Sequence, residues 1–129
     1  MSAESLAQYV ALGIGSFQFL ANSALLFRGF SRLPEELAKE GAAGRIADLL
    51  RTAWVYGMLG NLCISVLLIV IAVPLRTGEP LARHLAAAIG VYYVVLGFAA
   101  YTFAPSRHPG LLVFTALGIG LLAPLWLSR

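Results

Sequence analysis

Four long stretches without a charged residue limit what this chain can fold into more than any other feature. Only 12% of the 129 residues are charged, and all nine basic and six acidic residues lie outside these stretches. Each is roughly 18 to 22 residues long, enough for a helix to cross about 30 Å of hydrocarbon. The sequence therefore predicts four transmembrane helices. They are Leu6–Phe27, Thr52–Val73, Leu85–Ala104 and Gly110–Leu127.

The connections after the second and third stretches are short, which makes those neighbours antiparallel. The predicted fold is an all-α membrane protein, an antiparallel bundle of four transmembrane helices that forms one integral membrane domain over residues 1–129. Small residues at helical spacing let membrane helices approach closely. On the third helix Ala86, Gly90 and Gly97 share one stripe with Tyr93, and on the fourth helix Ala116, Gly120 and Pro124 share another.

The longest connection, Leu33–Arg51, joins the first two helices and carries much of the charge. Pro34 suits the first turn of a helix, whereas Gly41 and Gly44 interrupt it. We interpret the segment as an amphipathic connector at the headgroup surface, with a gate or a partner-binding element as the alternative. At the far end of the second helix, Pro74 predicts termination.

Basic residues predict the orientation in the membrane. Six lie in the first and third loops, and three lie on the other side. The six are Arg28, Arg32, Lys39, Arg45, Arg51 and Arg107, and the three are Arg76, Arg83 and Arg129. This excess predicts a multi-pass protein of a bacterial inner (plasma) membrane with both termini outside. The first stretch is expected to be retained, because it lacks a basic region before it and is long for a secretory signal.

Amides and tyrosines at mid-membrane depth are the first group of candidate site residues. Gln18 and Asn61 fall near the midplane with Tyr92 and Tyr93, and Asn22 lies one helical turn beyond Gln18. Polar groups at this depth need partners. They form an interhelical network, line a cavity for a lipid, quinone-like or other amphipathic ligand, or face a second copy of the chain. The sequence leaves these three interpretations open.

Basic residues at the starts of the third and fourth helices form the second group. Arg83 and His84 begin one helix and Arg107 and His108 begin the other, at positions where lipid headgroups lie. The alternative is a solvated interface with local ion pairs. The two histidines belong to opposite membrane faces, about 30 Å apart, so they do not share a metal or haem. We predict no metal site and no cofactor.

The four stretches contain no Asp, Glu, Lys or Arg, so the usual residue for proton or ion coupling is missing. Catalytic side chains do not gather at a common depth either, and an enzyme is the less favoured interpretation. The sequence favours a non-catalytic membrane protein that binds an amphipathic or lipid-like ligand within the bundle or serves as a subunit of a membrane assembly. The alternative is a small homo-oligomeric transporter or channel. Expected partners are membrane lipids and a second copy or another membrane protein, but not nucleic acid, because the basic residues flank membrane spans.

Overall fold

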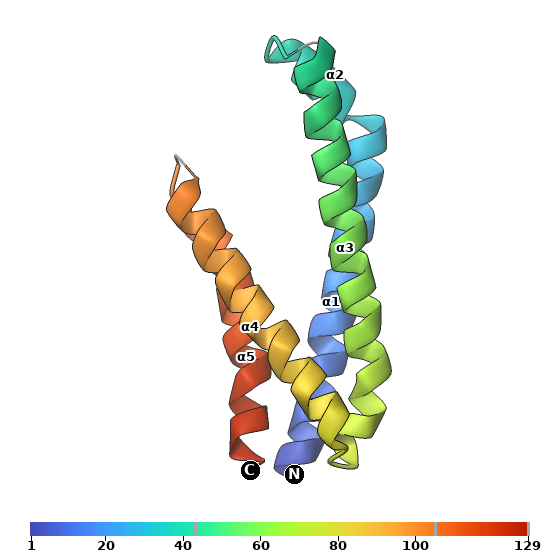
Figure 1. Ribbon diagram of the computed structural model, residues 1–129, viewed down its shortest axis with the longest axis vertical. Helices are drawn as coiled ribbons and strands as arrows, with labels where there is room; N and C mark the ends of the chain where they lie inside the picture. The colour runs from blue at the N-terminus through green and yellow to red at the C-terminus, as the bar shows by residue number, and fades with distance from the viewer. Residues whose placement is uncertain (43, 105, 129) are drawn as a thin grey trace. The chain divides into compact units, whose positions relative to one another are not determined.

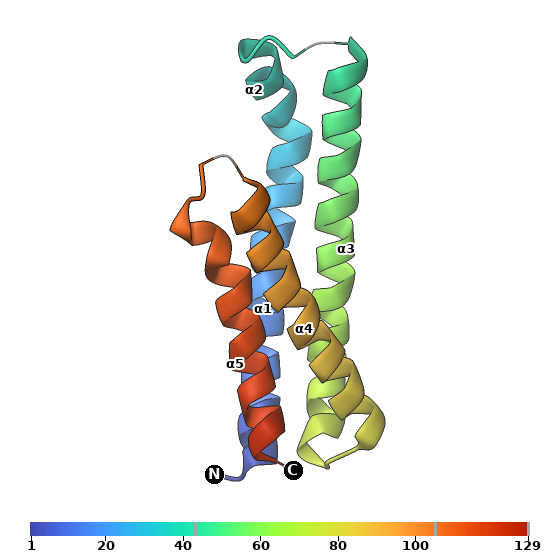
Figure 2. The same cartoon turned by 60° about the vertical axis from the view of Figure 1, so that its left-hand side comes forward.

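The computed structural model describes residues 1–42, 44–104 and 106–128, and its long elements are helices (Figure 1). Four helical segments are long and apolar enough to cross a membrane, and the fourth of them comprises Pro109–Leu127 (Figure 2). The prediction of an all-α, multi-pass membrane protein is therefore confirmed. The helices are α1 (Ala3–Ser31), the short α2 (Leu33–Lys39), α3 (Gly44–Arg76), α4 (Pro80–Phe103) and α5 (Val113–Leu127), and a 3₁₀ turn, η1 (Pro109–Leu112), leads into α5.

The chain forms two units. One comprises residues 1–15 and 67–129, and the other comprises residues 16–66. The two units bury different kinds of side chain. Every buried hydrophobic side chain of the described residues belongs to the first unit, and every buried polar one belongs to the second. The buried polar side chains are Gln18, Asn22, Asn61 and Ser65.

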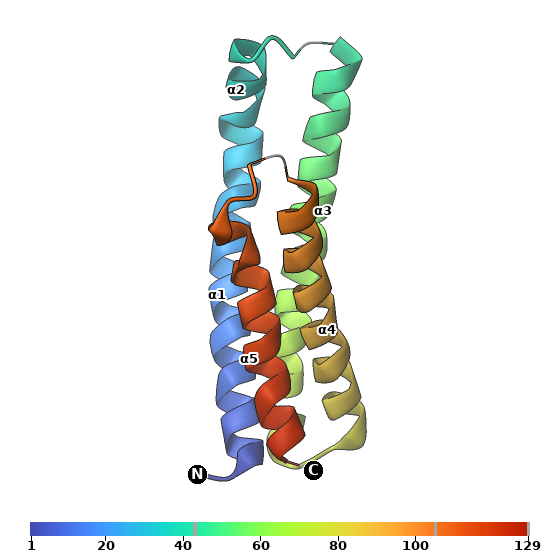
Figure 3. The same cartoon turned by 90° about the vertical axis from the view of Figure 1, so that its left-hand side faces the viewer.

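In the first unit, α4 and α5 form an antiparallel hairpin (Figure 3). The stripe predicted on α4, which includes Gly90, Tyr93 and Gly97, is buried as expected. The Thr115 hydroxyl of α5 donates a hydrogen bond to the Val94 carbonyl of α4 over 3.1 Å. Helix backbones approach closely where small residues face each other, and here that approach also brings a hydroxyl to a backbone acceptor.

The stripe predicted on the fourth helix is wrong for two of its three residues. Ala116 and Gly120 are exposed, and only Pro124 is buried. The glycine that meets α4 is Gly118, where a Cβ atom would lie 2.7 Å from the Val94 nitrogen. Several small residues occur on this helix, and their spacing alone does not say which face meets the neighbouring helix.

The end predicted for the second helix at Pro74 is also wrong. Helix α3 continues through Pro74 to Arg76, because a proline in the last turn removes only one backbone donor. The stop signal is Gly78, which has a φ of 72°. Its N–H donates to Leu75, and the N–H of Glu79 donates to Pro74, as in a glycine-terminated helix.

In the second unit, the predicted connector is present as α2 and the first two turns of α3 (Figure 1). Pro34 lies in the first turn of α2 as predicted, and Gly41, with a φ of 77°, follows its end. An ion pair of 2.8 Å between Arg28 and Glu36 joins α2 to the end of α1. Both side chains are about half exposed, so this pair adds less than about 1 kcal/mol.

Trp54 joins α1 to α3 within the second unit. Its indole Nε1 donates a hydrogen bond of 2.9 Å to the Leu25 carbonyl, and its ring lies directly on Gly29. A side chain at Gly29 would occupy the space of the indole. The glycine therefore accommodates the ring, and the hydrogen bond sets the position of the ring along α1.

Replacing Trp54 with Phe should lower the free energy of unfolding by about 1 kcal/mol, because the ring is kept and one hydrogen bond to a backbone carbonyl is lost. Thermal unfolding of the purified protein in detergent micelles measures this change. Tyr56→Phe is the matched control, since the Tyr56 side chain is 72% exposed. Equal stability of Trp54→Phe and the wild type would show that the indole N–H contributes nothing.

Candidate functional site

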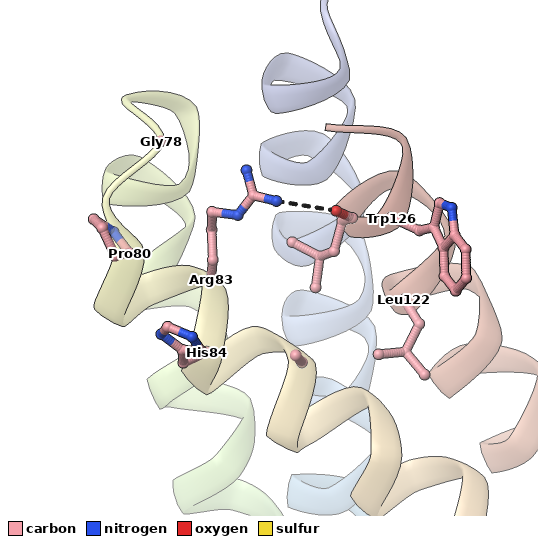
Figure 4. A pocket seen from close by; sticks show the side chains of 8 residues that line it. Gly78, Pro80, Arg83, His84, Leu122 and Trp126 are labelled. Carbon is pink, nitrogen blue, oxygen red and sulfur yellow. Dashed lines mark hydrogen bonds between the residues drawn. The ribbon is translucent and has the colours of Figure 1, made fainter. Parts of the chain in front are cut away.

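A pocket of about 500 Å³ lies between the first turns of α4 and the last turns of α5, within the first unit (Figure 4). We call it the α4–α5 pocket. Gly78 and Pro80 form one side of it at the turn before α4, and α5 supplies apolar side chains on the other. Its polar side chains are Arg83 and His84, two of the four residues predicted to contact headgroups.

Helix α4 begins at Pro80 because the Glu79 carboxylate accepts a hydrogen bond of 2.7 Å from the N–H of Ala82. A side-chain acceptor at this position is a favourable helix N-cap. The predicted start at Leu85 is thus five residues late. As a result, Arg83 and His84 stand on the first helical turns rather than in a flexible loop, and their backbone positions are fixed by the helix.

Arg83 is half-buried and reaches across to the end of α5 (Figure 4). Its guanidinium donates to the carbonyl of Ser128 over 2.9 Å and to that of Leu125 over 3.2 Å. The last carbonyls of a helix have no partner within the helix, and a basic side chain satisfies them well. A guanidinium carries five N–H donors, so these two bonds use less than half of its donor capacity.

The rest of the α4–α5 pocket is apolar. Leu122, Leu125 and Trp126 line it from α5, and Ala87 lines it from α4. A second, wholly apolar depression of about 430 Å³ shares Leu122 and Trp126 with it and continues along α5. A charged pocket that adjoins an apolar groove matches the two ends of an amphipathic molecule.

The other predicted headgroup pair, Arg107 and His108, is exposed in the loop before η1. His108 has a structural role there, because its Nδ1 accepts a hydrogen bond of 3.0 Å from the N–H of Gly110 and caps η1. Arg107 has a φ of 44°, a conformation uncommon for a residue with a side chain. Neither residue lines the α4–α5 pocket. Headgroup contact by this pair stays a prediction.

The mid-depth amides of α1 are buried, and they bond to each other. Asn22 Nδ2 donates to the Gln18 side-chain Oε1 over 2.9 Å and to the Gln18 backbone carbonyl over 2.7 Å. Both bonds join residues of the same helix that are one turn apart. Gln18 and Asn22 therefore satisfy part of each other's hydrogen-bonding capacity within one helix, whereas the predicted partners were another helix, a ligand or a second copy.

The remaining mid-depth residues differ in burial. Asn61 is buried on α3, and its backbone carbonyl accepts a hydrogen bond of 2.7 Å from the Ser65 hydroxyl. Tyr93 is fully buried, and its ring contacts those of Tyr92 and Phe114. Tyr92 is 38% exposed. A polar network or ligand cavity that combines these residues with Gln18 stays a prediction.

Sequence reasoning did not assign Leu122, Leu125 and Trp126 to a site with Arg83. These residues are more than 35 positions from Arg83, and only the folded hairpin brings them together. The signal that was present in the sequence is the Arg83-His84 pair next to a predicted helix start. In the described part of the chain, no three His, Cys, Asp or Glu side chains form a group able to hold a metal ion. No family model, curated protein or solved structure matches this chain.

Proposed function

We propose that this multi-pass membrane protein binds an anionic amphiphile, such as an anionic phospholipid, in the α4–α5 pocket. The observation that carries this proposal is the position of Arg83. Its charge lies at the mouth of a pocket of about 500 Å³ whose other walls are mostly apolar. The protein acts in this proposal as a binding protein or as a lipid-dependent subunit of a membrane assembly, not as an enzyme.

The charge of Arg83 supports an anionic ligand. The carbonyls of Leu125 and Ser128 hold the guanidinium in place without cancelling its charge, because carbonyl groups are dipoles with no net charge. A guanidinium fixed in this way suits a phosphate, which accepts two parallel hydrogen bonds from it. His84 lines the same pocket and adds a polar contact that can donate to the same group.

The apolar lining supports a lipid rather than a water-soluble anion. Trp126 is 73% exposed, and Leu127 next to it is 70% exposed. Tryptophan is favoured where a membrane meets water, so its place beside the pocket fits the headgroup level of a bilayer. The adjoining groove over Ile119 and Ala123 then lies where the acyl chain of the same molecule would run.

The test is lipid binding to the purified full-length protein in neutral detergent, measured by native mass spectrometry with phosphatidylglycerol and phosphatidylcholine of the same acyl chains. The wild type should prefer phosphatidylglycerol. Arg83→Gln should weaken phosphatidylglycerol binding about tenfold, because it removes a charge-assisted contact. Equal binding of the two lipids by the wild type would overturn the proposal.

Two further variants separate binding from folding, since Arg83 also caps α5. Ala87→Phe fills the pocket from α4 without changing any charge, and it should weaken phosphatidylglycerol binding while the protein stays folded. Arg76→Gln removes an exposed charge outside the pocket and should leave binding unchanged. If Arg76→Gln and Arg83→Gln weaken binding equally, the effect is general attraction of anionic lipid to a basic surface.

We also propose that the protein lies in a bacterial inner membrane with both termini outside. Four crossings place the turn before α4 and both chain ends on the same face, and the excess of Arg and Lys lies on the other. A reporter that is active only in the cytoplasm, fused after Arg129, should be inactive. The same reporter inserted after Lys39 should be active. The opposite pattern would reverse the orientation and place the α4–α5 pocket at the cytoplasmic surface.

A further inference from the structure

The second unit contains another hollow, of about 390 Å³, between the end of α1 and the start of α3. We call it the α1–α3 hollow. Gly29 and Phe30 line it from α1, and α3 supplies the other side. The α3 residues used below are Asp48, Arg51, Thr52 and Tyr56. None of these residues was assigned to a site from the sequence, and the hollow shares no residue with the α4–α5 pocket.

The two helices that form the walls of this hollow are joined by contacts of Trp54. The Trp54 indole lies on Gly29 and donates to the Leu25 carbonyl, so it fixes α3 against α1 at the edge of the hollow. The hollow is therefore a consequence of how the two helices are joined, and it exists before any ligand arrives.

The hollow presents one negative and one positive group. Asp48 and Arg51 are three residues apart on α3, a spacing that places both side chains on one face of a helix. Among the described residues the ion pair that forms is Arg28–Glu36, and neither Asp48 nor Arg51 takes part in one. Opposite charges that share a face but do not pair with each other can each bind a separate group of a ligand.

The depth of the hollow points to a lipid. Arg51 is the last charged residue before the uncharged stretch that starts at Thr52, so the hollow spans the boundary between headgroups and hydrocarbon. Phe30 and Tyr56 are 62% and 72% exposed there, and both rings offer apolar surface. An aromatic face also attracts an ammonium group.

From these observations we propose that the α1–α3 hollow binds the zwitterionic phosphoethanolamine headgroup of a membrane lipid. The Arg51 guanidinium and the Thr52 hydroxyl donate hydrogen bonds to the phosphate, and the Asp48 carboxylate accepts from the primary ammonium. A choline headgroup has no N–H to donate to Asp48. A glycerol headgroup has no cation, so its phosphate lies beside an unpaired carboxylate. The hollow therefore selects phosphatidylethanolamine over both other lipids.

The experiment uses the full-length protein in neutral detergent and compares lipids with identical acyl chains by native mass spectrometry. The wild type should bind phosphatidylethanolamine more tightly than phosphatidylcholine. Asp48→Asn should reduce this preference about tenfold, since a charge-assisted hydrogen bond is lost, without weakening phosphatidylglycerol binding. Arg51→Gln should weaken phosphatidylethanolamine and phosphatidylcholine alike, because both carry the phosphate.

Matched controls lie close by in the sequence. Glu35→Gln and Arg45→Gln each remove one exposed charge from the same unit, outside the hollow, and should leave the preference unchanged. Soluble phosphoethanolamine should neither bind nor compete, because it lacks acyl chains. Binding of the soluble compound instead of the lipid would overturn the proposed lipid source. An Asp48→Asn variant with the wild-type preference would overturn the site.

This proposal and that for the α4–α5 pocket fail separately. Arg83→Gln should leave the preference for phosphatidylethanolamine over phosphatidylcholine intact, and Asp48→Asn should leave the preference for phosphatidylglycerol over phosphatidylcholine at least as strong. Loss of both preferences in either variant would show that neither the α4–α5 pocket nor the α1–α3 hollow selects a headgroup on its own.

Discussion

Replacing Gly118 with Leu should lower the free energy of unfolding by about 3 kcal/mol, the largest effect that we expect from a single substitution in this chain. Gly118 is buried where α5 crosses α4. A Cβ atom there would lie 2.5 Å from the Gly90 carbonyl oxygen and 2.7 Å from the Val94 nitrogen. Those atoms are backbone, so they move only if the two helices separate.

The separation would also affect the neighbouring contacts. The hydrogen bond from Thr115 to the Val94 carbonyl is 3.1 Å long, and it lies one turn from Gly118. Moving α5 away from α4 would break it, and the burial of Leu121 would be lost with it. Thermal unfolding in micelles, or unfolding by a denaturing detergent, measures the loss of stability.

Gly120→Leu is the matched control for this prediction. Gly120 lies two residues further along α5, is exposed, and has open space where a Cβ atom would stand. The same substitution there should keep or raise stability, by up to about 1 kcal/mol, because Leu favours a helix more than Gly does. Equal losses at both positions would show that α5 does not face α4 through Gly118.

The comparison of these two glycines shows what the sequence could predict and what it could not. The absence of charge in four stretches was enough to predict four spanning helices, because a charge inside a bilayer is costly. The contact face of α5 was not predictable in the same way. Its residues are almost all small or apolar, so a lipid-facing stripe and a helix-facing stripe have the same composition.

Helix ends show a similar limit. Pro74 was expected to terminate α3, but two more residues are helical and Gly78 provides the terminating conformation. Asp48 and Arg51 belong to the predicted connector, and they lie on the first turns of α3, which continues without a break into the apolar stretch. The predicted span begins at Thr52, where charge ends, but nothing in the chemistry of charged residues prevents a helix from extending beyond the membrane.

The candidate site was predicted in part for a related reason. Arg83 and His84 were named because neighbours in sequence at a helix start are necessarily neighbours in space. The α5 side of their pocket depends on where the last turn of α5 ends relative to α4, and Trp126 had no sequence signal that linked it to Arg83. Pairings across the bundle come from packing, which short-range patterns do not describe.

Asn22→Leu should lower the free energy of unfolding by about 2 kcal/mol, the second largest effect that we expect. Asn22 is almost fully buried, with 1% of its surface exposed, and Gln18 is 3% exposed. Substitution of Asn22 removes the donor that serves both the Gln18 side chain and the Gln18 carbonyl. Leaving the Gln18 amide oxygen buried without that donor costs more than the bond itself contributed.

Gln18→Leu should cost less than Asn22→Leu. The Asn22 Nδ2 group would keep its hydrogen bond of 2.7 Å to the backbone carbonyl of residue 18, and only the bond to Oε1 would be lost. The double variant should be more stable than the sum of the two single losses predicts, with a coupling of about 1 kcal/mol. Ser16→Ala, at an exposed position of α1, is the control and should change little.

This double-mutant cycle also tests the ligand cavity, one of the three interpretations that the sequence left open, against the intrahelical pair that the structure shows. If Gln18 and Asn22 serve mainly each other, two leucines replace a satisfied pair with apolar groups of similar size, and lipid binding is unchanged. If the pair lines a ligand cavity, the double variant keeps its stability but binds phospholipid more weakly by native mass spectrometry. A coupling free energy of zero would exclude the intrahelical pair. When two side chains bond to each other over 2.9 Å, the stability losses of the two single substitutions are not independent.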